Sequence, residues 1–158
     1  LNQINKENIQ NLEIDWNFYS GQISESNTIQ ASPIFTGKFL INVTFDAVIA
    51  IDPLSGDSVW RTQLSPPVGR RGLIFDALDQ PLIYVATGND IVALDEDTGD
   101  ISQIYETGKS LLAPILTSNQ LTVATLNDGL KAFNRKSGEQ IWHFSLQDKS
   151  KNPSKYTN

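Results

Sequence analysis

The stretch IAIDPLSGDSVW, residues 49–60, decides the fold, because the chain repeats its pattern twice. The later copies are VALDEDTGDISQ at residues 92–103 and KAFNRKSGEQIW at residues 131–142. Each copy has an apolar run, Asp or Asn, two variable residues, and then Ser or Thr followed by Gly. The glycines are 43 and 39 residues apart. A repeat of about 40 residues with strand character is typical of β-propeller blades.

The residues around each copy favour short strands over helices. The apolar runs are short, rich in β-branched or aromatic residues, and bounded by Gly, Pro or Asp. No stretch keeps a helical periodicity for long. Polar turns fall where four antiparallel strands need them, and the Gly that closes each Ser/Thr-Gly turn can adopt a positive φ at little cost. The sequence therefore predicts an all-β fold, a β-propeller of four-stranded antiparallel blades.

The repeats divide the chain into three blades and one additional strand. Trp16 stands 44 residues before Trp60, which predicts an outer strand that completes the last blade and closes the ring. The expected boundaries are about 12–20 for this outer strand, about 29–64, 72–106 and 111–146 for blades 1 to 3, and 147–158 for a polar loop or cut end. Because fewer than about four blades do not close a ring, we expect an incomplete propeller.

Charge and composition argue against several classes of function. The net charge of −6 disfavours a nucleic-acid partner, which would require clustered Lys and Arg. The absence of Cys excludes disulfides and thiolate metal sites. The single histidine, His143, rules out multi-His metal sites and disfavours a Ser-His-Asp triad.

The recurring residues of the repeats have structural interpretations. The tryptophans, Trp16, Trp60 and Trp142, are interpreted as packing elements that bridge adjacent blades, because large aromatics bury much apolar surface. The polar residues that open the repeat turns, Asp52, Asp95 and Asn134, are interpreted as caps of their own backbone amides. We therefore assign no catalytic role to either set.

Three segments outside the repeats carry a family resemblance. Residues 1–16, followed by Ser20-Gly21, resemble the opening phrase of pyrroloquinoline quinone (PQQ)-dependent alcohol and sugar dehydrogenases. The segment IQASPIF at residues 29–35 resembles the first inner strand of that family, and RRGLIF at residues 70–75 resembles the start of its second blade. The resemblance covers nearly the whole chain and implies an amino-terminal part of a propeller with quinoprotein-type repeats.

The same resemblance implies two cofactors, PQQ and Ca²⁺, on the propeller axis, and oxidation of an alcohol or sugar hydroxyl. Arg71 would pair with a quinone carboxylate, because a planar guanidinium can form two parallel hydrogen bonds with it. Gln30 would hydrogen-bond the cofactor from the first blade. The catalytic Asp and the remaining calcium ligands of the family would lie beyond Asn158, so we expect no catalytic or metal-binding residue here.

Two departures from the family pattern bear on this interpretation. Val68-Gly69-Arg70 stands where many alcohol-oxidising members carry a vicinal Cys pair, which weakens an assignment to alcohol dehydrogenases in particular. The short turn Leu126-Asn127-Asp128-Gly129 stands where the family often supplies a calcium-binding Glu from a longer hairpin.

The resemblance also implies partners and a location. The partners would be the remaining blades of the same protein, a small alcohol or sugar substrate and a periplasmic electron acceptor, with no nucleic acid. The protein would be periplasmic, or membrane-associated and facing the periplasm.

Two other functions stay open. A noncatalytic scaffold of the outer-membrane assembly-factor type uses the same repeat, needs no cofactor, and would have a binding groove on an edge or face. Alternatively, copies of a partial propeller could assemble to close a ring, because unpaired strand edges require a partner.

Overall fold

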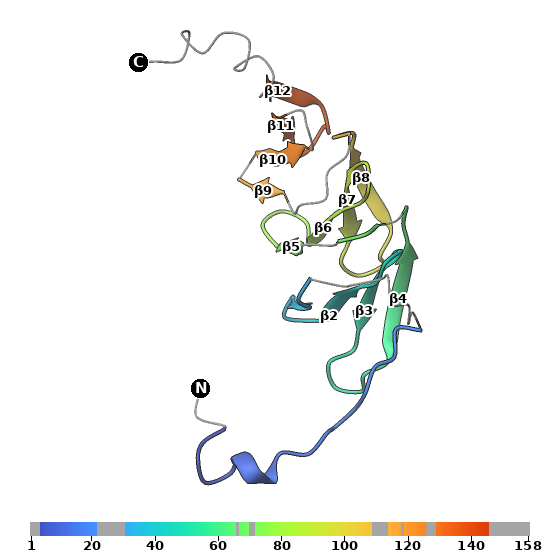
Figure 1. Ribbon diagram of the computed structural model, residues 1–158, viewed down its shortest axis with the longest axis vertical. Helices are drawn as coiled ribbons and strands as arrows, with labels where there is room; N and C mark the ends of the chain where they lie inside the picture. The colour runs from blue at the N-terminus through green and yellow to red at the C-terminus, as the bar shows by residue number, and fades with distance from the viewer. Residues whose placement is uncertain are drawn as a thin grey trace.

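The computed structural model describes residues 4–21, 31–65, 67–69, 72–108, 114–117, 119–125 and 129–145. Three four-stranded sheets follow one another along the chain and lie side by side in an arc (Figure 1). The helix η1 (Ile9–Asn11) is a single 3-10 turn that precedes them. In the part of the chain that the structure describes, no helix is long and apolar enough to cross a membrane.

The three sheets are built alike. Blade 1 comprises β1 (Ile34–Phe35), β2 (Leu40–Val43), β3 (Ala47–Ile51) and β4 (Ser58–Gln63). Blade 2 comprises β5 (Leu73–Asp76), β6 (Leu82–Ala86), β7 (Ile91–Asp95) and β8 (Ile101–Tyr105). Blade 3 comprises β9 (Ile115–Leu116), β10 (Gln120–Thr125), β11 (Gly129–Asn134) and β12 (Gln140–Ser145). Within each blade the strands pair antiparallel in chain order, which confirms the predicted all-β fold of four-stranded blades in an incomplete propeller.

The repeat turns join the third and fourth strands of each blade, and the predicted caps are confirmed. Asp95 Oδ1 accepts hydrogen bonds from the backbone N–H groups of Asp97 (2.9 Å) and Thr98 (3.0 Å). Asp52 and Asn134 form the corresponding bonds in the other two blades. These side chains satisfy turn amides that no strand pairs, which is why Asp and Asn are favoured there.

Each blade has a register shift at the same point. The pairing of the third and fourth strands shifts directly after an Ala, at Ala50, Ala93 and Ala132. Each Ala lies opposite the outer-strand residue four positions after the repeat-turn glycine, namely Trp60, Gln103 and Trp142. Such bulges increase local twist and redirect a side chain. The repeat is therefore preserved in backbone geometry as well as in sequence.

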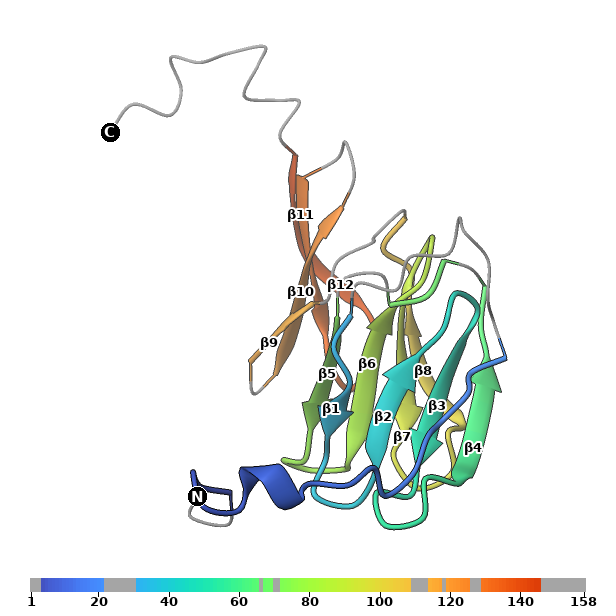
Figure 2. The ribbon, with the colours of Figure 1, turned by 60° about the horizontal axis from the view of Figure 1, so that its bottom comes forward.

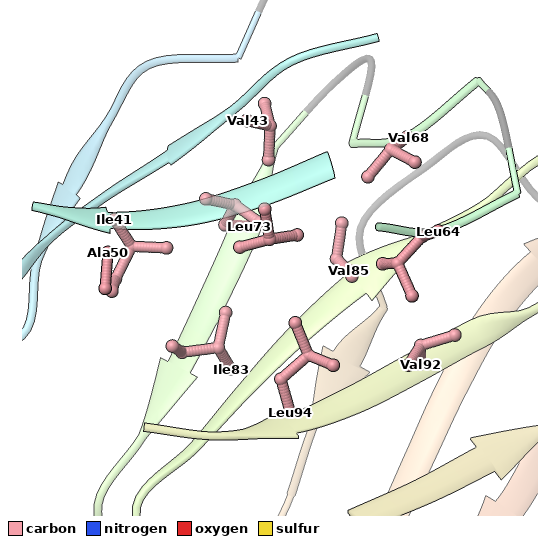
Figure 3. Close-up of a cluster of buried hydrophobic side chains, with 11 residues drawn as sticks. Ile41, Val43, Ala50, Leu64, Val68, Leu73, Ile83, Val85, Val92 and Leu94 are labelled. Atoms are coloured by element: carbon pink, nitrogen blue, oxygen red, sulfur yellow. The ribbon is translucent and has the colours of Figure 1, made fainter. Parts of the chain in front are cut away.

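Alternation along the strands gives blade 2 two buried faces. Ile83 and Val85 of β6 pack toward blade 1, whereas Tyr84 and Ala86 of the same strand pack toward blade 3. The first cluster, drawn in Figure 3, comprises Ile41, Val43, Val48, Ala50, Leu64, Val68, Leu73, Ile83, Val85, Val92 and Leu94. The second comprises Tyr84, Ala86, Ile91, Ala93, Tyr105, Leu121 and Phe133. The core thus lies between neighbouring blades.

A tryptophan fastens each of the first two repeat turns. Trp60 Nε1 donates to the carbonyl of Glu96 (2.8 Å), and its ring covers Gly99 so closely that an added Cβ would lie 2.6 Å from Cε3. Trp16 makes the same two contacts with the turn of blade 1: its Nε1 donates to the carbonyl of Pro53 (3.0 Å), and its ring covers Gly56. The predicted packing role of these two tryptophans is confirmed.

The amino-terminal segment lies along blade 1 (Figure 2). Besides the Trp16 contact, Arg61 Nη1 donates to the carbonyl of Ser20 (3.5 Å). Residues 12–20 have no strand assignment in the structure, so the closing outer strand stays a prediction. The exact limits of the blades as units also stay predictions.

Gly99→Ala tests the docking of Trp60. Gly99 has a φ of +74°, and an added methyl would meet both the Trp60 ring and Thr62 Oγ1. We expect the free energy of unfolding of the intact protein to fall by roughly 2–4 kcal/mol, from backbone strain and overpacking together. Urea unfolding followed by tryptophan fluorescence measures this loss.

Gly37→Ala is the matched control. Gly37 also has a positive φ, +100°, but nothing lies within 4 Å of an added Cβ. Its substitution should cost only the backbone term of about 1–2 kcal/mol. Equal losses in the two variants would contradict a steric role for Trp60.

Candidate functional site

Both residues predicted to contact a quinone, Gln30 and Arg71, lie outside the described residues, so their roles stay predictions. The chain beside Arg71 is described. Gly69 N–H donates to the carbonyl of Ala86 in β6 (2.7 Å), and Gly72 N–H donates to the carbonyl of Gly69 (3.2 Å). The described residues on either side of Arg70 and Arg71 are therefore bonded to each other, and Gly69 is held against blade 2.

Val68 and Gly69, which precede the two arginines in the chain, pack into the junction of blades 1 and 2. Val68 is buried, and its N–H donates to the carbonyl of Phe45 (2.9 Å) in the β2–β3 hairpin. An added Cβ on Gly69 would lie 2.9 Å from Val43 Cγ1. This is the end of the sheets opposite the repeat turns, and we call it the hairpin end. Ala31, which follows Gln30 and packs against the same core, also precedes β1 at the hairpin end.

The short hairpin of blade 3 reaches the hairpin end as well. Thr125 of β10 pairs with Gly129 of β11, and residues 126–128 of the predicted short turn come between them in the sequence. Those three residues lie outside the described part of the chain. Among the residues that the structure does describe, no group of three or more His, Cys, Asp or Glu side chains could hold a metal ion.

A buried ion pair joins blades 2 and 3 at the repeat-turn end. The guanidinium of Arg135, in the repeat turn of blade 3, pairs with the carboxylate of Asp76 at the end of β5. The two side chains are only 11% and 9% exposed. Arg135 Nη1 also donates to the carbonyl of Thr117 (2.7 Å), and the guanidinium lies 5.8 Å from the ring centre of Tyr84. The ion pair and the Tyr84 contact hold blade 3 against blade 2, and the bond to Thr117 fixes the guanidinium within blade 3.

Gln103 occupies the position that Trp16 and Trp60 hold at the other turns. Its amide lies over Gly138, where an added Cβ would be 3.0 Å from Gln103 Cδ. The hydrogen bond that an indole makes elsewhere comes instead from Tyr105, whose hydroxyl donates to the carbonyl of Arg135 (2.7 Å). Two residues of β8 thus divide the contacts that a single tryptophan makes at the other junctions.

The hydroxyl of Tyr105 stays a hydrogen-bond donor because it is kept neutral. Burial raises the pKa of Tyr105 far above its ordinary value, and the adjacent Tyr84 raises it further. The rings of Tyr84 and Tyr105 lie 6.2 Å apart, and Phe133 packs edge-on against Tyr105 at 6.0 Å. This aromatic cluster is the centre of the blade 2–blade 3 core.

A cavity of about 410 Å³ lies at the junction of blades 2 and 3, and its lining includes Arg135 and Lys136. Its lining cations already have partners, since Arg135 pairs with Asp76, and Lys136 Nζ lies 3.3 Å from Asp79 Oδ2. The Gln80 amide is bound to Asp95 Oδ2 (3.2 Å). The arrangement fastens two blades, and each of the two cations in the lining is paired with a carboxylate.

The contacts at this junction do not follow from the repeat pattern of the sequence. Arg135 occupies a variable position of the repeat, where the other copies have Pro53 and Glu96, and Asp76 lies far from it in the chain. The one available signal was Gln103, the only member of the series without a tryptophan, which marks the junction as different.

Comparison with known proteins supports the repeat assignment. A family model described as PQQ_2, outer membrane protein assembly factor BamB, matches residues 44–155. Among curated proteins, outer membrane protein assembly factor BamB from Francisella salina is 28% identical over 127 residues, which are 77% of this chain and 23% of that protein. The chain therefore spans about a quarter of the length of this relative.

Solved structures share the fold. A europium-containing methanol dehydrogenase matches 90% of this chain and 28% of its own, with a TM-score of 0.71 and 20% identity. Quinohemoprotein alcohol dehydrogenase from Comamonas testosteroni matches 92% of this chain and 24% of its own, with a TM-score of 0.69 and 20% identity. BamB from Moraxella catarrhalis matches 73% of this chain and 38% of its own, with a TM-score of 0.56 and 20% identity. These likenesses confirm the predicted quinoprotein-type propeller fold.

Arg135→Ala tests the buried ion pair. Removing the guanidinium leaves the Asp76 carboxylate buried without its partner, so we expect the free energy of unfolding to fall by about 3–5 kcal/mol. Lys136→Ala is the neighbouring control. Its pair with Asp79 is 83% and 76% exposed, and its loss should cost less than about 1 kcal/mol. Similar losses, measured by urea unfolding, would contradict the fastening role of Arg135.

Proposed function

We propose that this chain, which belongs to the repeat family described as PQQ_2, outer membrane protein assembly factor BamB, forms part of a PQQ-dependent dehydrogenase. The observation that carries the proposal is the segment before residue 44, which the family model leaves uncovered. There the opening phrase resembles the dehydrogenases, and Trp16 fastens the segment to blade 1. The methanol and alcohol dehydrogenases match 90% and 92% of the chain, which supports the same interpretation.

In this proposal Arg71 binds a carboxylate of the quinone and Gln30 orients the cofactor from blade 1. The described residues next to both positions belong to the hairpin end of blades 1 and 2, where side chains from several blades can meet. The bound quinone would supply the oxidising chemistry for an alcohol or sugar hydroxyl. Ligands for Ca²⁺ would come from other parts of the protein.

The proposal includes a location and partners. The protein would be periplasmic, or membrane-associated and facing the periplasm, as the names of its outer-membrane relatives support. Its partners would be the remaining blades, a small alcohol or sugar, and a periplasmic electron acceptor.

A noncatalytic scaffold is the second candidate function. The matched family model and the curated relative from Francisella salina are both described as an outer membrane protein assembly factor. In that case the propeller would bind other proteins and no quinone.

Arg71→Ala separates the two candidates. We expect the full-length protein to bind PQQ in the presence of Ca²⁺ and to reduce a dye with alcohols or sugars. Loss of a charged hydrogen-bond donor costs about 1.5–3 kcal/mol, so Arg71→Ala should weaken PQQ binding at least tenfold. Gln30→Ala, which removes a neutral partner at about 0.5–1.5 kcal/mol, should weaken it several-fold.

Arg70→Ala is the control, because it removes the same charge one residue earlier and should leave PQQ affinity nearly unchanged. Affinity is measured by isothermal titration calorimetry. Equal losses in the two arginine variants would refute the role of Arg71. Absence of both PQQ binding and dye reduction in the wild-type protein would refute the dehydrogenase and leave the scaffold.

A further inference from the structure

A groove of about 500 Å³ opens between blades 1 and 2. Its lining comes from the end of β4 and the residues after it, from the β6–β7 turn, and from β7 and β8. The lining residues are Gln63, Leu64, Ser65, Thr87, Asn89, Asp90, Val92, Ile101 and Ile104. β4 and β8 lie on the convex side of the arc (Figure 1), so the groove faces away from the inner strands β1 and β5.

The floor of the groove continues the core between the two blades. Leu64 and Val92 belong to that core and are 8% and 4% exposed. Val92 pairs with Ile104, and directly paired residues of neighbouring strands share a face of the sheet. Ile101, paired with Leu94 of the same core, follows the same rule. Both isoleucines therefore lie on the blade 1 side of β8.

These two isoleucines are left uncovered by blade 1. Trp60 closes the junction at the repeat-turn end by docking on Gly99. Toward the hairpin end, β4 presents the polar Gln63, and Ile101 and Ile104 each remain 47% exposed. Neighbouring exposed apolar side chains with a polar rim are one of the features that mark a surface for binding a partner.

Asp90 is the charged residue among the described residues that line the groove. Partial burial raises the pKa of Asp90, and the neighbouring carboxylate of Glu106 raises it further. None of the described residues that line the groove is a lysine or arginine. A cation brought next to Asp90 would relieve this repulsion, so charge complementarity favours a basic group in the occupant.

We propose that this groove binds an extended segment of a partner protein that carries aliphatic side chains next to a lysine or arginine. The aliphatic side chains would cover Ile101 and Ile104, and the cation would lie beside Asp90. A peptide fits better than a compact ligand because β8 lies at the edge of its sheet, where an extended chain can add to the strand. The proposal goes beyond the quinone function and does not depend on it.

The test uses the full-length protein and a phage-displayed library of random linear dodecapeptides. We expect the enriched sequences to share an aliphatic residue close to a lysine or arginine. A fluorescein-labelled synthetic peptide of the enriched sequence then serves as the probe in fluorescence anisotropy. Ile104→Ser should weaken its binding at least tenfold, Ile101→Ser should weaken it to a smaller degree, and Asp90→Asn should weaken it several-fold at low salt.

Ile141→Ser is the matched control, since Ile141 is also 47% exposed and also lies on an outer strand, β12. The Ile141→Ser variant should bind the labelled peptide as tightly as the wild type does. Circular dichroism should show that all variants are folded. No enrichment, enrichment of acidic peptides, or equal binding by the wild type and Ile104→Ser would overturn the proposal. Dye reduction should be unchanged in Ile104→Ser, so failure of the groove is distinguishable from failure of the dehydrogenase.

Discussion

Each repeat turn is fixed by a side chain from the preceding segment that lies over its glycine. Trp16 covers Gly56 and Trp60 covers Gly99, and in both cases the indole N–H is bound to a carbonyl of the same turn. The glycine is required because a Cβ would occupy the place of the ring. The apolar clusters between blades lie beside these contacts, so their packing depends on the spacing that the contacts impose.

The junction between blades 2 and 3 shows how this constraint can be met with different chemistry. Gln103 covers Gly138 but leaves the turn carbonyl to Tyr105, and the buried pair of Arg135 and Asp76 supplies a further link. A buried ion pair is a geometrically demanding link, because its desolvation is offset only when both partners are correctly placed. At this junction, Gln103 at the tryptophan position is therefore accompanied by further contacts from Tyr105 and from the Arg135–Asp76 pair. The first junction, which keeps its tryptophan, is instead open toward the hairpin end, where the groove lies.

The residues that recur in every repeat could be predicted from the sequence, whereas the contacts that occur at a single junction could not. The glycines, the capping Asp and Asn residues and the tryptophans recur at fixed spacing, so their roles could be inferred from local physics alone. Asp76 and Arg135 are 59 positions apart and belong to no repeated pattern, so their contact depends on how two blades face each other. For the same reason the exposure of Ile101 and Ile104 could not be foreseen. The cofactor contacts, Gln30 and Arg71, were inferred from family resemblance and lie outside the described residues.

The distance along the chain between a tryptophan and its turn gives assembly a direction. The carbonyl that Trp60 binds, that of Glu96, is 36 residues further on, and Trp16 and Pro53 are separated by 37. During synthesis a blade can pair its own strands first, since hairpins are local, but its docking side chain has no partner until the next repeat turn has been made. A newly completed blade therefore keeps its docking side chain uncovered until the next repeat turn has formed.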